Sequence, residues 1–229
     1  CLEAGTVGNG YLAGQISTIV SPLAFLATAV NTSESSGGSD EEDDESYAER
    51  LRLRPNSFSV AGPEKAYIFH TFSVSSAIID VAIDSPTPGV VNVYTLLTGG
   101  ELPKAAFLNE VENYLASEEV RPLTDEVHAL APTASSYSVN VDYYVLNSDA
   151  VKLDSIKAAV QAAVNDYVAW QQSKIGRDIN PDELIKRVRD AGAGRVVHST
   201  LTPVFKTLTK SEVAQCSSVT VTFKGLEDG

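Results

Sequence analysis

The chain has 229 residues, of which 43% are hydrophobic and 21% are charged, and its formal net charge is −13. A chain of this length buries about 70% of its unfolded surface on folding, so it needs no disulfide or metal ion to support a core. The strong negative charge argues against a nucleic-acid partner, because acidic side chains repel the phosphate backbone.

The charge is unevenly distributed along the chain. Residues 1–150 hold 21 acidic and 6 basic side chains, a net charge of −15, whereas residues 151–229 hold 9 acidic and 11 basic ones, a net charge of +2. This division favours contacts between unlike surfaces of neighbouring molecules, although solvated faces that only maintain solubility explain it equally well. No apolar run is long enough for a membrane span.

The first 38 residues are predicted to be rich in β-structure. Residues 5–30 alternate Gly, Ser and Thr with apolar residues, which favours short strands and turns, and residues 31–39 read as an exposed loop. The letters Gly8-x-Gly10-x-x-Ala13 match the dinucleotide fingerprint. No buried strand comes before them and Pro22 follows soon after, so we interpret them as a structural turn and expect no cofactor.

An acidic run, Asp40 to Glu45, follows this segment. A calcium-binding loop that began at Asp40 would need Gly in its sixth place and Glu in its twelfth, where this chain has Glu45 and Leu51. The run is instead predicted to begin a helix over about 44–54, with acids in its first turn and arginines in its last, which complements the helix dipole. Pro55 is expected to end this helix.

The middle of the chain predicts a helix, a hairpin and a second helix. A helix is expected over 63–73, because Pro63 suits a first turn. Strands are expected in "AIIDVAID" (77–84) and "VVNVYTLL" (90–97), joined by a turn that contains Pro and Gly. Residues 104–117 carry apolar side chains at steps of three and four, typical of an amphipathic helix.

The last hundred residues alternate strands with helices. The segments "EVHALAPT" and "SYSVNVDYYVLN" come first, and the second has the alternation of a half-buried strand. A long helix over 154–173 and a helix that starts with Asn180 and Pro181 follow, and "RVVHST" and "SVTVTF" read as closing strands. The whole order predicts an α+β fold with antiparallel sheets packed by helices, divided into a β-rich segment 1–38, a central domain 39–125 and a C-terminal domain 126–229.

Motifs of catalysis are missing from the sequence. His70, His128 and His198 stand apart, and neither a nucleophile elbow nor a phosphate-binding loop occurs. We therefore expect no enzyme and no metal site. Two alternatives stay open: a hydrolase with a site assembled from dispersed residues such as His128, Asp125 and a nearby Ser, or a protein- or carbohydrate-binding module. Exposed tyrosines on one sheet, for example Tyr137, Tyr143 and Tyr144, would support the second.

Four stretches in collinear order carry a resemblance to a known family. They are "AGTVGNGYLAGQISTIV", "GGSDEEDDESYAERLRLR", "FLNEVENYLASEEVRPLTDEVHALAPT", and the long helix together with "GRDINPDELIKRV". In this order the chain resembles the baseplate J-like proteins of contractile-tailed phages and contractile injection systems. Members of that family usually have further residues ahead of the Gly-rich segment, so we expect native sequence before Cys1.

The resemblance implies a structural role in the tail baseplate of a virion or related machine. It implies a protein made in the bacterial cytoplasm that joins copies of itself, as a dimer or ring, and neighbouring wedge proteins around the tail hub. For such contacts we predict an electrostatic surface and an apolar anchor. The interface residues predicted are Asp40, Glu41, Glu42, Asp43, Asp44 and Glu45 in the acidic run, with Tyr167 and Trp170 as the anchor.

Overall fold

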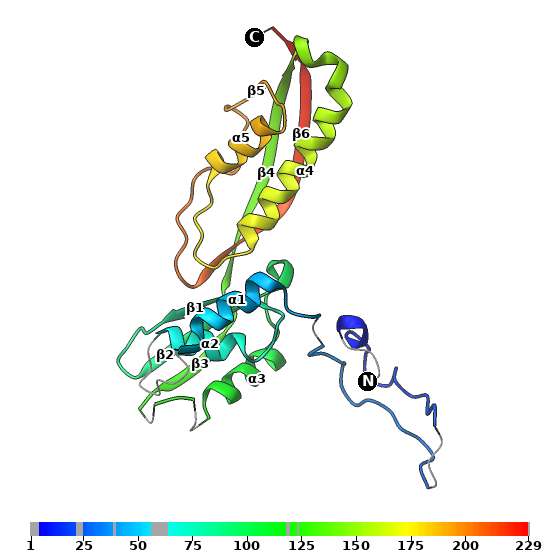
Figure 1. Ribbon diagram of the computed structural model, residues 1–229, viewed down its shortest axis with the longest axis vertical. Helices are drawn as coiled ribbons and strands as arrows, with labels where there is room; N and C mark the ends of the chain where they lie inside the picture. The colour runs from blue at the N-terminus through cyan, green and yellow to red at the C-terminus, as the bar shows by residue number, and fades with distance from the viewer. Residues whose placement is uncertain are drawn as a thin grey trace.

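The computed structural model describes residues 5–21, 25–38, 40–55, 64–117, 120–122 and 124–228. Figure 1 shows an extended N-terminal segment, a central unit built on one sheet and a C-terminal unit built on a second sheet. The C-terminus lies at the end of the molecule farthest from the central unit. The α+β class predicted from the sequence is confirmed.

The N-terminal segment, residues 5–38, begins with a short 3-10 helix, η1 (Thr6–Gly8), and then folds back on itself. Its two arms are joined by backbone hydrogen bonds, from Gly10 N to Ser35 O over 2.8 Å and from Gly14 N to Asn31 O over 2.9 Å. The Asn31 side chain also bonds to the backbone of the other arm, at Ile16 N and Leu12 O. The described residues of this segment are therefore two paired extended arms and not the short strands predicted.

Many large apolar side chains of this segment face solvent. Those that are at least 43% exposed are Val7, Tyr11, Leu12, Ile16, Val20, Phe25, Leu26 and Val30. Within its described residues, the segment therefore has no apolar core of its own.

Two helices open the central unit. Helix α1 (Asp44–Leu53) has the predicted bounds within one residue, with acids in its first turn and arginines in its last. Only Leu53 of this helix is buried, whereas Tyr47 and Leu51 are 49% and 54% exposed. Helix α2 (Glu64–Phe72) matches the second predicted helix and buries Ala66, Tyr67, Phe69 and Thr71.

The sheet of the central unit has the order β1-β2-β3. Strands β1 (Ile78–Asp84) and β2 (Val90–Leu97) form the predicted antiparallel hairpin, and β3 (Glu126–Leu130) pairs with β2 in parallel. A parallel partner needs a crossover, which helix α3 (Ala105–Leu115) supplies. Because β3 belongs to this sheet, the central unit continues past the boundary predicted after residue 125.

The sheet of the C-terminal unit has the order β5-β4-β6. Strand β4 (Thr133–Leu146) pairs in parallel with β6 (Glu212–Glu227) along its whole length and antiparallel with β5 (Arg195–Val196). Both sheets are therefore mixed, whereas antiparallel sheets were expected. The predicted strand in "RVVHST" is only two residues long, because the chain then turns and regains β4 only through a bridge between Thr202 and Asn140.

Helices α4 (Leu153–Gln172) and α5 (Pro181–Asp190) cover one face of this second sheet, as Figure 1 shows, and α4 follows a 3-10 turn, η4 (Asn147–Lys152). The core beneath them contains alternate residues of β4, among them Val139, Val141 and Val145, each at most 1% exposed. The alternation in the sequence predicted this inward face because successive side chains of a strand point to opposite sides.

A small apolar cluster joins the two units. Leu96 of β2, Ile175 of the loop after α4 and Val213 of β6 pack together, with exposures of 0%, 6% and 0%. Next to it, Gln215 donates to the carbonyl oxygen of Gly100 over 2.6 Å. Gly100 lies in the short turn η3 (Thr98–Gly100), with a φ of 76°, and a Cβ there would come within 2.9 Å of the Gln172 side chain. The units are thus held by packed side chains as well as by the chain between β3 and β4.

Candidate functional site

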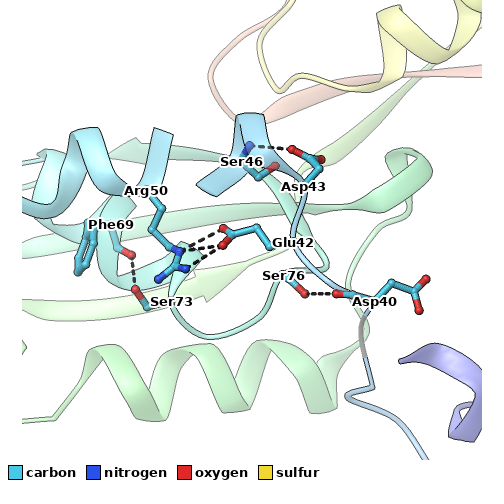
Figure 2. A network of polar contacts seen from close by, with 8 residues as sticks. All are labelled: Asp40, Glu42, Asp43, Ser46, Arg50, Phe69, Ser73 and Ser76. Atoms are coloured by element: carbon cyan, nitrogen blue, oxygen red, sulfur yellow. Dashed lines mark hydrogen bonds and ion pairs between the residues drawn. The ribbon is translucent and has the colours of Figure 1, made fainter. Parts of the chain in front are cut away.

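The acidic run lies where the N-terminal segment meets the central unit, and its side chains have three different environments (Figure 2). Asp43 is the N-cap of α1: its carboxylate accepts a hydrogen bond from Ser46 N over 2.7 Å. This bond satisfies one of the free amides at the helix N-terminus. It also lowers the pKa of Asp43, because the charged form accepts the bond.

Glu42 forms an ion pair with Arg50 of α1. Its carboxylate accepts hydrogen bonds from Arg50 Nε over 3.1 and 3.2 Å and from Arg50 Nη2 over 2.8 Å, a forked contact that also raises the pKa of the guanidinium. Arg50 lies 5.4 Å from the ring centre of Tyr47. The pair ties the segment ahead of α1 to the last turn of that helix, as Figure 2 shows.

Asp40 connects the run to two other parts of the chain. Its carboxylate accepts hydrogen bonds from Thr6 N over 3.1 Å and from Thr6 Oγ1 over 3.2 Å, and its carbonyl oxygen accepts one from Ser76 Oγ over 2.9 Å. Thr6 belongs to the N-terminal segment and Ser76 precedes β1. Asp40 is therefore a link between that segment and the central unit.

A polar hollow of about 300 Å³ lies beside the Glu42–Arg50 pair. Its floor includes the loop after α2, where Ser73 Oγ donates to Phe69 O over 2.9 Å. The hollow is open, and the charged side chains in its lining, Glu42 and Arg50, are paired with each other.

Glu41, Asp44 and Glu45 point to solvent along the same run. Of the six acidic residues predicted as an electrostatic interface, these three are the ones whose carboxylates have no hydrogen bond or ion pair among the described contacts. They form the exposed acidic surface, which we define as Glu41, Asp44 and Glu45. The role of this surface in an interface stays a prediction.

The predicted apolar anchor is divided by the structure. Tyr167 is fully buried in the C-terminal core, where burial raises the pKa of its hydroxyl, and that hydroxyl donates to Asn180 O over 3.1 Å. Trp170 is only partly buried. The guanidinium carbons of Arg177 and Arg187 lie 4.1 Å and 5.3 Å from the centre of its ring. Only Trp170 of the pair presents surface that a partner can reach.

The sequence did not single out Asp80, which, like Gln215, joins the two units through a polar contact. Its carboxylate accepts a hydrogen bond from Ile175 N over 2.7 Å, close to Lys174 and Arg177. Burial raises the pKa of Asp80, because the site excludes water from the charged form. The signal in the sequence was an acid in the middle of an apolar strand, between Ile79 and Val81 in "AIIDVAI".

The residues named for a hydrolase have other partners. Asp125 accepts a hydrogen bond from the Tyr67 hydroxyl over 2.7 Å. Burial, together with this bond, raises the pKa of Tyr67. His128 has a different neighbour, because its Nε2 lies 3.4 Å from a carboxylate oxygen of Glu126. His70 is partly buried, which lowers its pKa. No histidine lines the hollow beside the Glu42–Arg50 pair, and none lines a second hollow, of about 350 Å³, between η3 and α4. Neither hollow therefore brings together the residues named for a hydrolase, His128 and Asp125.

The tyrosines named for a binding module do not share an exposed face. Tyr137 and Tyr143 point into the core, with exposures of 8% and 2%, whereas Tyr144 lies on the other face of β4 with Arg195 Cζ 4.3 Å from its ring centre. They do not form an aromatic platform.

Three further features concern the residues that the structure describes. No group of three or more His, Cys, Asp or Glu side chains is arranged to hold a metal ion there. None of the helices in those residues combines the length and the apolarity needed to cross a membrane. The thiol of Cys216 is free, and Cys1 lies outside the described residues.

Comparison with protein families gives three matches in order along the chain. Residues 1–38 match the Baseplate J-like protein barrel domain, residues 59–131 the Baseplate J-like central domain, and residues 139–222 the Baseplate J-like protein C-terminal domain. The last two matches lie over the two sheets, and the first over the segment that has no core of its own among its described residues.

Two individual proteins are similar to the chain. Baseplate protein J of Escherichia phage P2 is 28% identical over 156 residues, which cover 68% of this chain and 51% of that protein. A chain in the six-fold symmetrised baseplate of the anti-feeding prophage has the same fold, with a TM-score of 0.53 and 15% identity over 89% of this chain and 48% of that one. The chain thus spans about half the length of each.

Proposed function

Because the chain belongs to the baseplate J-like family, we propose that it is a non-enzymatic structural subunit of the baseplate of a contractile phage tail or a related injection machine. The observation that carries the proposal is the ordered match of three domains of one family. In this role it assembles with copies of itself, as a dimer or ring, and with neighbouring wedge proteins around the tail hub. Its place is the virion tail baseplate, after synthesis in the bacterial cytoplasm.

The shape of the molecule supports an assembly role. Two small units in series, with a further segment hydrogen-bonded to the first, give a long surface for contacts, as Figure 1 shows. The hollows are shallow and open, and the polar groups around the acidic run are used to join parts of the chain. Symmetric assemblies repeat the same surfaces in every copy, so a few such contacts suffice.

Genetic removal tests the proposal directly. In the phage or prophage that encodes the chain, deletion of its gene should leave tails without assembled baseplates, and the full-length protein supplied in trans should restore them. Electron microscopy of the particles and detection of the protein in purified baseplates are the measurements. Normal, contractile tails in the deletion strain would overturn the proposed function.

The exposed acidic surface is proposed as an electrostatic contact with a neighbouring wedge protein. The variant E41Q/D44N/E45Q removes its three negative charges and leaves the bonds of Asp40, Glu42 and Asp43 in place. We expect weaker binding to the partner and a smaller dependence of the dissociation constant on salt between about 0.05 and 0.5 M, because screening acts on exposed charges. Titration calorimetry measures both.

A matched control removes three exposed charges elsewhere. The variant E64Q/E101Q/E110Q changes the net charge by the same amount on other parts of the central unit. It should bind the partner as the unchanged chain does. Equal effects of the two variants would show that total charge matters and that the acidic surface makes no specific contact.

A further inference from the structure

Strand β6 has one unoccupied edge. It pairs with β4 from Glu212 to Glu227, and in the described part of the chain no strand lies along its other side. At 16 residues it is much longer than the usual strand of about 5–6. Its outer edge therefore presents a long row of backbone N–H and C=O groups that no other strand takes up, a template for a further strand.

The middle of this edge carries few of the devices that protect exposed strands. From Val213 to Phe223 there is no charged residue, no Pro and no Gly, and the first lysine is Lys224. The pairing with β4 is irregular only between residues 216 and 218 and again between 223 and 225, so Ser218–Phe223 forms a regular strand. Residues of this composition, rich in Val and Thr, favour strand pairing.

An apolar strip runs beside the same edge. Val219 is 40% exposed, and it lines a hollow of about 350 Å³ together with Val168 and Ala169 of α4. Val221 and Phe223 follow on the same face of the sheet and are partly buried. A strand added outside β6 would cover this strip with its own inward side chains.

We propose that the outer edge of β6 pairs antiparallel with β6 of a second copy of this chain, forming one continuous sheet across a two-fold axis near Thr220. The inference deepens the self-assembly part of the proposed function and rests on it. A second copy fits because the strand is complementary to itself: Val and Thr side chains face Val and Thr side chains, and β-branched pairs stabilise adjacent strands.

Charge also favours a second copy at this place. Two chains of net charge −13 repel each other, and the excess acid lies in residues 1–150, whereas the part that contains β6 has a net charge of +2. Antiparallel pairing near Thr220 places Lys224 of each copy opposite the uncharged part of the other strand, far from its counterpart. Over residues 216–224 of each strand, the two copies thus meet without like charges opposite each other.

A lysine near the axis tests the pairing. In the full chain, T220K places two ammonium groups next to each other across the proposed axis, and we expect the self-association constant to weaken at least about tenfold, because opposed like charges are costly. Sedimentation velocity over a range of concentrations measures it. The control, T207K, adds the same charge at an exposed threonine of the loop before β6 and should leave self-association unchanged.

Hydrogen exchange gives a second measurement that needs no variant. Amides of residues 217–223 in the unchanged chain should become more protected as its concentration rises, because pairing engages those that point outward. A chain that stays monomeric at high concentration, equal weakening by T220K and T207K, or exchange independent of concentration would each overturn the pairing.

The two proposals fail in different ways. A monomeric chain that still enters baseplates would refute the β6 pairing and leave the proposed function in place. A chain that dimerises through β6 but is not found in baseplates would refute the proposed function alone.

Discussion

At the scale of single residues, the polar side chains that matter most are those that join parts of the chain. Asp40, Glu42 and Asp43 bind to the N-terminal segment, the last turn of α1 and its first turn, in that order. Asp80 is the clearest case because it is partly buried and bonds across two units. A run of acids that looks uniform in sequence thus contains individual structural links together with an exposed acidic surface.

Asp80 should reveal its role through two substitutions. D80A leaves the buried Ile175 amide without its acceptor and should lower the free energy of unfolding by about 1–3 kcal/mol. D80N keeps an acceptor for that amide and should cost much less. Urea denaturation at neutral pH measures both, and equal losses would show that the hydrogen bond to Ile175 is not what stabilises the contact.

The pH dependence of Asp80 has a definite sign. Burial raises its folded-state pKa above the unfolded value of 3.8, so the folded state binds the proton more tightly. Its contribution to stability is therefore greatest below pH 3.8 and is lost as the pH rises through the folded pKa. Relative to D80N, the unchanged chain should gain stability as the pH falls toward 3.8. Urea unfolding of both proteins at several pH values measures this, and a loss of relative stability on acidification would contradict a raised pKa for Asp80.

At the scale of elements, helix α5 shows how far local signals specify a structure. Asn180 caps it, its side chain accepting a hydrogen bond from Asp182 N over 2.9 Å, Pro181 is the first helical residue, and the helix ends at Asp190. Leu184 and Val188 on its inner face are fully buried. The capping residues at its N-terminus and the spacing of its buried apolar residues both indicate a helix at this place, so α5 was predictable from the sequence.

Loss of the cap should destabilise the C-terminal unit measurably. N180A removes the acceptor for the Asp182 amide, and we expect a loss of about 1 kcal/mol in the free energy of unfolding. The control, N165A, removes an exposed amide from the surface of α4 and should change stability by less than about 0.5 kcal/mol. Circular dichroism during urea unfolding is the measurement, and similar losses in both variants would refute a capping role.

At the scale of the whole molecule, stability depends on whether the two units unfold together. The cluster of Leu96, Ile175 and Val213 is the apolar part of their contact, and Asp80 and Gln215 supply its polar part. These contacts are few, so they couple the units without merging them into one core.

A cavity in this cluster should weaken that coupling. L96A should lower the free energy of unfolding by about 2–5 kcal/mol, because a fully buried leucine is lost, and should separate the unfolding of the two units into distinct transitions. Differential scanning calorimetry detects such separation. The control is V204A, at a residue that is 74% exposed. It should unfold in the same number of transitions as the unchanged chain.

Much of the secondary structure was predictable, because helices α1 to α5 and the β1-β2 hairpin depend on local periodicity, caps and turn residues. The division of the acidic run was not. Its letters show that a helix starts there, but which carboxylate meets Thr6, Arg50 or Ser46 depends on where segments distant in sequence come together. The same limit applies to Tyr167 and Trp170, which are three positions apart and differ in burial.

The sequence by itself determined the α+β class, the helices and the family, because these depend on local periodicity and on the order of segments. Only the tertiary structure decided that each sheet is mixed, that β3 completes the first sheet and that β6 lies at an open edge. Strand neighbours are chosen by contacts between residues far apart in the chain. Neither the periodicity of a strand nor its composition encodes which strand will lie beside it.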